Sequence, residues 1–167
     1  MKSFKSLLLL AALSLPVSFA AIAQKPSMGC IDKSIRLQAD EIKHFYTDQG
    51  LVVYRDAMIN MESMQPFPIM ADMQKGQLYM IVFVGHAAVQ RMKLEMYDGN
   101  DQKLEEKFMF RNRQQPNYII YSFSPPRSDS YLMTFMQKLK NENMCGSICI
   151  MKVPASKQGA EIKPYQP

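Results

Sequence analysis

The chain has 167 residues, of which 47% are hydrophobic, with 20 Lys and Arg against 15 Asp and Glu. This length suits a single domain with its own core and leaves no room for a catalytic domain beside an accessory one. Two of the cations lie in the first 23 residues, so the other 144 residues carry 18 cations against 15 acidic residues. So small an excess, with no stripe of basic and aromatic residues, argues against nucleic-acid binding.

The first 23 residues have the pattern of a secretory signal peptide. Lys2 and Lys5 give a positive start, an apolar run follows over residues 7–15, and the small residues at 21–23 form a cleavage site. The apolar run is about half the roughly 20 residues that a membrane-spanning helix needs, and no later segment comes closer. We therefore expect an exported protein, periplasmic or secreted, with no transmembrane segment.

Export permits a disulfide, and the chain has three cysteines, at Cys30, Cys145 and Cys149. If the last two lie on one strand, four steps of about 3.3 Å place their Cα atoms about 13 Å apart, beyond the roughly 7 Å that a disulfide spans. Cys30 then pairs with one of them, and we predict Cys145, with Cys149 left as a buried thiol. Lipidation of Cys30 is the competing use, although residues 27–29 form a poor lipoprotein box.

The predicted elements begin with a linker over residues 24–31 and a helix over residues 32–48. Asp32 is placed to cap the helix and Gly50 to end it. Beyond Gly50, short runs rich in Val, Ile, Tyr, Phe and Met are separated by Pro, Gly, Asn, Asp and Ser, which is typical of strands and turns. The predicted strands lie at about residues 51–58, 67–73, 77–84, 91–97, 104–110, 118–124, 131–137 and 148–153.

Two of these runs predict how the strands are buried. The run over residues 78–84 is apolar on both faces and indicates a central strand. Met92, Leu94 and Met96 alternate with charged residues, which indicates a half-buried strand with one wet face. Seven or eight such strands with regular turns indicate a mainly β fold, an antiparallel β-sandwich. We expect one domain over residues 32–153 and a flexible tail over residues 154–167.

Five short motifs follow one another in the second half of the chain: GQLYMI at 76–81, MKLEMYDG at 92–99, YSFSP at 121–125, SYLM at 130–133 and GSICI at 146–150. In this order they resemble the bacterial pre-peptidase C-terminal type of β-sandwich domain over residues 76–153. The resemblance implies a jelly-roll-like sandwich that is exported and non-catalytic, with substrate or calcium binding in some members. The glycine usually expected before the aromatic at Tyr131 is absent. The mature chain also resembles small stand-alone exported Bacteroidetes-type proteins of unknown function.

A group of methionines is the main candidate for metal chemistry. Met58, Met61 and Met64 lie three residues apart, and thioether sulfur is a soft ligand that selects Cu(I). The chain has 15 Met, so methionine also serves it as an ordinary apolar filler. A methionine-rich periplasmic copper-binding protein is therefore the alternative function, and core packing is the simpler interpretation of the group.

Two further constellations have a chemical and a structural interpretation. Asp98, Asn100 and Asp101 offer oxygen ligands for calcium, but the same residue types suit a hairpin turn and their spacing does not fit an EF-hand. His86 follows the predicted central strand and would be the base of a hydrolase, the weaker alternative function. The motifs G-x-S-x-G and H-E-x-x-H do not occur. We predict no cofactor and no catalytic residue.

Exposed aromatic side chains are the candidates for ligand binding. Tyr97 and Tyr131 are the predicted ligand-binding residues, and Tyr97 should face outward beside a turn because it alternates with Met96. The interpretation that we favour is an exported, non-catalytic binding or cell-envelope accessory module rather than an enzyme. Its expected partner is a glycan, a peptide or a protein of the cell envelope.

Overall fold

The computed structural model describes residues 30–110, 116–140, 143–157, 159 and 161–166. The predicted signal peptide and most of the predicted linker lie outside the described residues. The described part contains one α-helix, α1 (Lys33–Asp48), and a short 3-10 helix, η1 (Ala155–Lys157). Its strands are β1 (Val52–Glu62), β2 (Phe67–Met73), β3 (Tyr79–Val84), β4 (Arg91–Tyr97), β5 (Lys103–Phe110), β6 (Tyr118–Phe123), β7 (Asp129–Lys138) and β8 (Asn143–Lys152).

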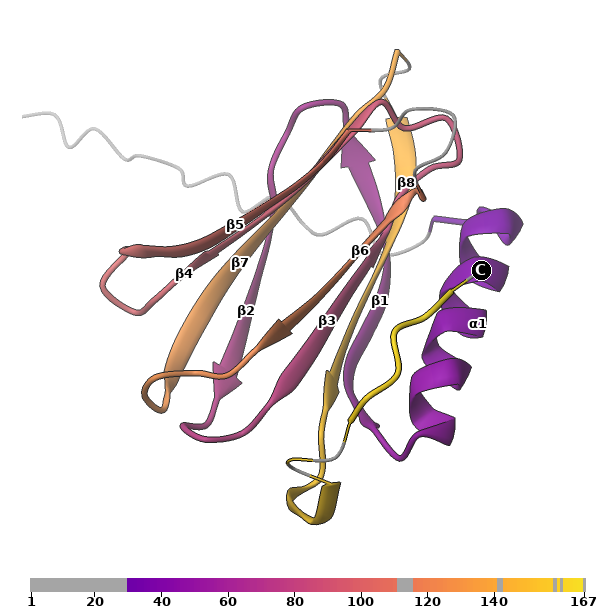
Figure 1. The fold of residues 1–167 in the computed structure, drawn as a ribbon. Helices are drawn as coiled ribbons and strands as arrows, with labels where there is room; N and C mark the ends of the chain where they lie inside the picture. The colour runs from indigo at the N-terminus through magenta and orange to yellow at the C-terminus, as the bar shows by residue number, and fades with distance from the viewer. Residues whose placement is uncertain (1–29, 111–115, 141–142, 158, 160, 167) are drawn as a thin grey trace, which may run out of the picture.

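The strands form two antiparallel sheets of four strands each, with the orders β1-β8-β3-β6 and β2-β7-β4-β5. The two sheets lie face to face, and α1 lies on the outer side of the first sheet (Figure 1). Consecutive strands alternate between the two sheets except at the hairpin of β4 and β5, and these strand orders give the jelly roll, which is built from two Greek keys. The predicted fold class, a mainly β jelly-roll-like sandwich with one N-terminal helix, is confirmed.

The helix begins where the sequence predicts it. The Oδ1 atom of Asp32 accepts hydrogen bonds from the backbone N–H groups of Ser34 at 2.9 Å and Ile35 at 3.2 Å, which satisfies two of the amides that a helix start leaves unpaired. Shortly after the last turn, Gly50 has a φ of 91°, a conformation that glycine adopts without strain. The apolar stripe of α1 packs on the outer face of β3 and β8, and consists of Ile35, Ala39, Ile42 and Tyr46.

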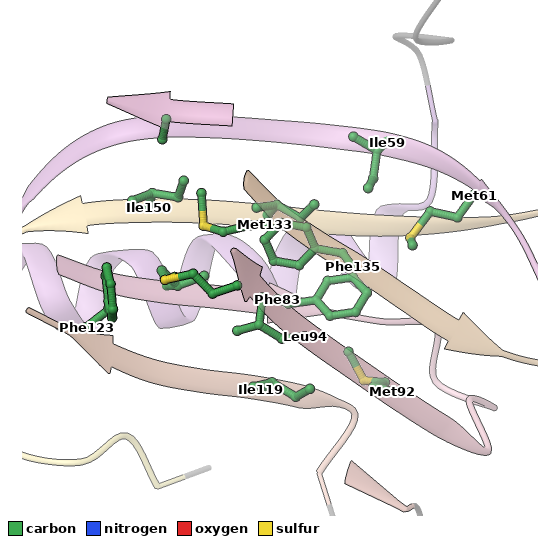
Figure 2. Close-up of a cluster of buried hydrophobic side chains, with 14 of the residues drawn as sticks. Ile59, Met61, Phe83, Met92, Leu94, Ile119, Phe123, Met133, Phe135 and Ile150 are labelled. Carbon is green, nitrogen blue, oxygen red and sulfur yellow. The ribbon is translucent and has the colours of Figure 1, made fainter. Parts of the chain in front are cut away.

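The main core lies between the sheets and follows the strand alternation. On β4, Met92, Leu94 and Met96 point into this core, as the period of two predicts. Phe83 and Phe135 meet edge to face from opposite sheets, with ring centroids 5.3 Å apart (Figure 2). Strand β3 is buried on both faces because one face meets this core and the other meets α1. Its predicted central position is therefore confirmed.

The structure contains the predicted disulfide between Cys30 and Cys145, whose Cα atoms are 5.6 Å apart. It ties the segment before α1 to β8. Cys149 is a free, buried thiol in the apolar cluster beneath the helix, and burial raises the pKa of this thiol to about 12.

The described part of the predicted tail, over residues 161–166, contacts the domain. The ring of Tyr165 packs against Phe45 and Tyr118, with centroid distances of 5.4 and 5.6 Å. Its hydroxyl donates a 2.8 Å hydrogen bond to Glu41. Ile162 also packs on the apolar cluster beneath α1, and the last described residues run beside the helix (Figure 1). Two apolar side chains in an otherwise polar segment thus hold this part of the tail on the domain.

Among the described helices, none has the length and apolar character needed to cross a bilayer.

Candidate functional site

The two sheets differ in what lies on their outer faces. The outer face of β1-β8-β3-β6 carries α1 and the described end of the chain. No described element packs on the outer face of β2-β7-β4-β5, which we call the open face. Its residues alternate with those of the core, and on the three strands β4, β5 and β7 they include Arg91, Lys93, Glu95, Tyr97, Glu106, Phe108, Phe110, Leu132, Thr134, Met136 and Lys138.

Aromatic and cationic side chains gather at one end of the open face. The strand register places Arg91 opposite Phe110 and Lys93 opposite Phe108. The two rings are nearly parallel, at 20°, with centroids 6.1 Å apart. The guanidinium carbon of Arg91 lies 4.9 Å from the Phe110 centroid and 5.1 Å from that of Phe108, within the range of a cation–π contact. Figure 1 shows the ends of β4, β5 and β7 side by side.

Lys138 of β7 completes this group from the other side of β4. The register pairs it directly with Arg91. The five residues Arg91, Lys93, Phe108, Phe110 and Lys138 are called the Arg91 cluster below. Phe108 and Phe110 keep 42% and 57% of their surface exposed, although large apolar side chains usually lose most of theirs on folding.

Within the described residues, the charge of Arg91 has no counter-charge. Among the residues that the structure describes, no carboxylate forms an ion pair with Arg91 or Lys138, and the Nε atom of Arg91 is buried without a hydrogen-bond partner. Like charges directly across two strands destabilise a sheet. Lys93 differs, because its Nζ lies 2.7 Å from a carboxylate oxygen of Glu95.

Further along the open face the charges compensate one another. Lys93, Lys103, Glu95 and Glu106 form a network of ion pairs with distances from 2.5 to 3.7 Å. Burial acts to raise the pKa of Glu95, but the hydrogen bond and positive charge of Lys93, helped by the hydrogen bond from Lys103, outweigh it and hold the pKa at about 2. Tyr97 lies half-buried at the end of the same strand, on the open face as predicted. Burial first, and the charge of Glu95 second, raise the pKa of Tyr97.

The prediction for Tyr131 is wrong. This residue is fully buried between the sheets, its ring centroid lies 5.3 Å from that of Phe123, and its hydroxyl donates a 2.8 Å hydrogen bond to the carbonyl of Arg127. The register of β7 turns Tyr131 inward together with Met133 and Phe135, so it offers no surface to a ligand.

The three methionines of the copper alternative are not brought together. Met58 packs beneath α1, Met61 lies between the sheets, and Met64 is 45% exposed in a turn. Residues three apart on a strand point to opposite faces, so β1 itself separates the first two sulfur atoms. Nowhere in the described ranges do three His, Cys, Asp or Glu side chains gather as metal ligands would.

His86 and Asp98 both serve local backbone structure. The Nδ1 atom of His86 accepts a 3.0 Å hydrogen bond from the backbone N–H of Ala88, and the backbone N–H of His86 donates to Oε1 of Gln137. The Oδ1 atom of Asp98 accepts from the backbone of Asn100 and Gln102 at 2.9 and 3.0 Å. Its Oδ2 atom lies 2.9 Å from Arg127. The turn interpretation of this acidic loop therefore fits the structure, and the described contacts of His86 include no Ser or Cys nucleophile.

A cleft of about 270 Å³ lies between α1 and β1. Lys43 crosses it and contacts Asp40 at 2.8 Å and Asp56 at 2.5 Å. Burial acts to lower the pKa of Lys43, but these two carboxylates outweigh it and raise the pKa above its ordinary value. The cleft is smaller than most ligand sites, and its central cation is already neutralised by its own neighbours.

No family model matches the chain, and no curated protein matches it. Among solved structures, the chain is similar to PliG of Aeromonas hydrophila, a periplasmic inhibitor of g-type lysozyme, at 10% identity and a TM-score of 0.45, over 63% of this chain and 90% of that one. It is also similar to the insecticidal delta-endotoxin Cry8Ea1 of Bacillus thuringiensis, at 15% identity and a TM-score of 0.38, over 59% of this chain and 20% of that one. A third likeness is to Drosophila melanogaster CENP-C bound to CAL1, at 9% identity and a TM-score of 0.29, over 72% and 99% of the two chains.

Proposed function

We propose that this chain is a non-catalytic binding protein that acts outside the cytoplasm and holds a second protein against its open face. The observation that carries the proposal is the Arg91 cluster, in which two large aromatic rings stay exposed beside Arg91 and Lys138, and neither cation forms an ion pair among the described residues. A leader with the features of a signal peptide and the Cys30–Cys145 disulfide support a location outside the cytoplasm.

The composition of the open face supports a protein partner. Arg and aromatic residues are enriched in the buried centres of protein interfaces, where they supply most of the binding energy. The face continues from the cluster over Met136 and Leu132 to Met70, which is 57% exposed. Apolar side chains thus extend over neighbouring strands, and a sheet face of this kind offers the flat, rigid surface that a folded partner needs.

The charges of the open face count against a polyanionic partner. Glu95 and Glu106 lie opposite each other on this face, one outward position beyond Lys93 and Phe108. Lys93 and Lys103 pair with these carboxylates, so a nucleic acid or an anionic membrane that covered the Arg91 cluster would gain no net attraction from this neighbouring part of the face. A protein can place an acidic group over the cations and a basic or neutral group over the carboxylates.

The test is site-specific photo-crosslinking in the cells that produce the protein, with benzoyl-phenylalanine placed at position 110, 70 or 37. Positions 110 and 70 lie on the open face, whereas Leu37 is a matched control because it is 71% exposed on α1. We expect a discrete protein adduct from positions 110 and 70 but not from position 37. The adduct is identified, and the purified partner is titrated against the wild-type protein.

The titration then tests the residues themselves. The double variant Phe108→Ser/Phe110→Ser should bind the purified partner at least about tenfold more weakly, as expected when interface anchors are truncated, while Leu37→Ser should bind it as the wild-type protein does. Absence of an adduct at both open-face positions, an equal adduct at position 37, or unchanged affinity of the double variant would overturn the proposal.

A further inference from the structure

We infer that the Arg91 cluster is a receptor for a carboxylate, and that the partner docks an acidic segment of its chain there. The inference rests on the proposed function and specifies the chemistry of the partner. It starts from the juxtaposition of Arg91 and Lys138, two cations placed directly across β4 and β7 with no ion pair within the described residues.

The surroundings of Arg91 determine how an anion can approach it. Its guanidinium carbon lies about 5 Å from both phenylalanine rings, at 4.9 and 5.1 Å, and its Nε atom is buried without a partner. The two terminal nitrogens therefore carry the donors that remain available to a ligand. Stacking against aromatic rings holds the planar guanidinium in place, so less side-chain entropy is lost when it forms the paired hydrogen bonds that a carboxylate accepts.

Lys138 explains why an anion is needed. Facing cations repel each other in the free protein, and a carboxylate bound between them would interact favourably with both. Lys93, the next outward residue of β4 after Arg91, does not need a ligand, because its Nζ already lies 2.7 Å from a carboxylate oxygen of Glu95. As far as the structure describes this face, the uncompensated positive charge thus lies at one end of it.

The neighbouring residues favour a carboxylate within a polypeptide over a sulfate or phosphate polymer. Phe108 and Phe110 offer exposed ring surface beside the cations, which an apolar side chain next to an acidic residue would cover. Further along the face Lys93 and Lys103 pair with Glu95 and Glu106, so a sulfate or phosphate polymer would gain attraction from the Arg91 cluster alone. The site therefore fits one carboxylate of a polypeptide at a time, and apolar neighbours of that residue would add contact with the rings.

The experiment measures binding of fluorescein-labelled poly-L-glutamate to the purified protein by fluorescence anisotropy, at low and at physiological salt. Arg91→Gln should weaken binding about tenfold, the effect of losing a charge-assisted hydrogen-bond pair, and Lys138→Gln about threefold. Lys75→Gln is the matched control, because Lys75 is an exposed lysine in the turn between β2 and β3, at the opposite end of the sandwich. Salt should weaken binding by the wild-type protein.

Heparin and vesicles of phosphatidylglycerol serve as competing probes. Tighter, Arg91-dependent binding of either would overturn the inference in favour of a sulfated polymer or a membrane, and so would poly-L-glutamate binding that Arg91→Gln leaves unchanged. Should Arg91→Gln fail to fold, the exposed Lys138→Gln variant decides. If poly-L-glutamate binding is independent of both cations while position 110 still crosslinks to a partner that requires Phe108 and Phe110, the carboxylate inference falls and the proposed function stands.

Discussion

Gln137 gives the sharpest test of how the sandwich is held together, because its fully buried amide links both sheets. The ladder between β3 and β8 ends at the pair Val84 and Ser147. Just beyond it, the backbone N–H of His86 donates to Oε1 of Gln137 at 3.0 Å, and Nε2 donates to the carbonyl of Cys145 at 2.7 Å. The amide therefore replaces one rung of the ladder.

Gln137→Leu keeps a side chain of similar volume and removes both hydrogen bonds to the backbone, together with the weak one to Sδ of Met61 at 3.4 Å. Each buried backbone group left without a partner costs about 1–3 kcal/mol. His86 is half-buried, so water recovers part of one loss, and we expect the free energy of unfolding to fall by about 3 kcal/mol. That is a large share of the roughly 5–15 kcal/mol typical of a domain.

The assay is equilibrium urea unfolding of the oxidised protein, with the free energy taken from the midpoint and the slope. Gln90→Leu is the matched control, since Gln90 is exposed and lies at the same end of the sandwich. It should change the free energy of unfolding by less than about 0.5 kcal/mol. A Gln137→Leu variant within that same margin of the wild-type protein would refute the bridging role of the amide.

Three further predictions concern other parts of the fold. Gly146→Ala should cost about 1–3 kcal/mol, because its added Cβ would lie 2.9 Å from Sδ of Met61 and 3.1 Å from Cε2 of Phe83; an unchanged urea midpoint would contradict this close approach. The double variant Cys30→Ser/Cys145→Ser should lose about 2–4 kcal/mol, since the disulfide closes a loop with a sequence separation of 115. Thiol labelling of the denatured, unreduced wild-type protein should find one free thiol, Cys149, and two or more would exclude a fully formed disulfide. Finally, the pKa of Glu95 in the folded protein is about 2 against an ordinary 4.5, so its ion pairs stabilise the protein fully above pH 4.5, and this contribution is lost as the pH falls toward 2. The urea midpoint of Glu95→Gln should therefore fall less than that of the wild-type protein between pH 4.5 and 2. Equal falls in the two proteins would show that Glu95 does not cause the loss of stability in acid.

The sequence predicted the strands well where one period dominates. Met92, Leu94 and Met96 alternate without interruption, and the predicted strand at residues 91–97 has the bounds of β4. The predicted strands at residues 51–58 and 148–153 are shorter than β1 and β8, because they lack the last residues of β1 and the first residues of β8. Residues 59–62 of β1 alternate between buried and exposed positions, but Asn60 weakens that pattern. Residues 143–147 of β8 contain Gly146, which resembles a turn in sequence and is required in the structure by the close approach of Phe83.

The candidate site could not be predicted from local patterns. Phe108, Met109 and Phe110 form an apolar run in which neither face is marked as buried, and only the structure shows that Met109 points into the core. Arg91 and Lys138 are 47 residues apart in sequence, so their meeting depends on the register of β4 with β7. The error at Tyr131 has the same cause. On β7 the polar residue Gln137 lies on the buried side and the apolar residue Leu132 on the open side, so the sequence does not indicate which face of this strand is buried.

Lys138→Glu separates a structural role of the Arg91 cluster from a binding role. The substitution places a carboxylate directly opposite Arg91 and replaces a repulsive cross-strand pair with an attractive one, which is worth about 0.2–1 kcal/mol of added stability. The same carboxylate would occupy the guanidinium and repel an incoming anion, so poly-L-glutamate binding should fall at least about tenfold. If the cluster only supported the sheet, the variant would gain stability and bind poly-L-glutamate as the wild-type protein does. Urea unfolding and anisotropy on the same preparation distinguish the two roles. If the cluster binds a ligand, the variant protein should be more stable than the wild type and bind poly-L-glutamate more weakly.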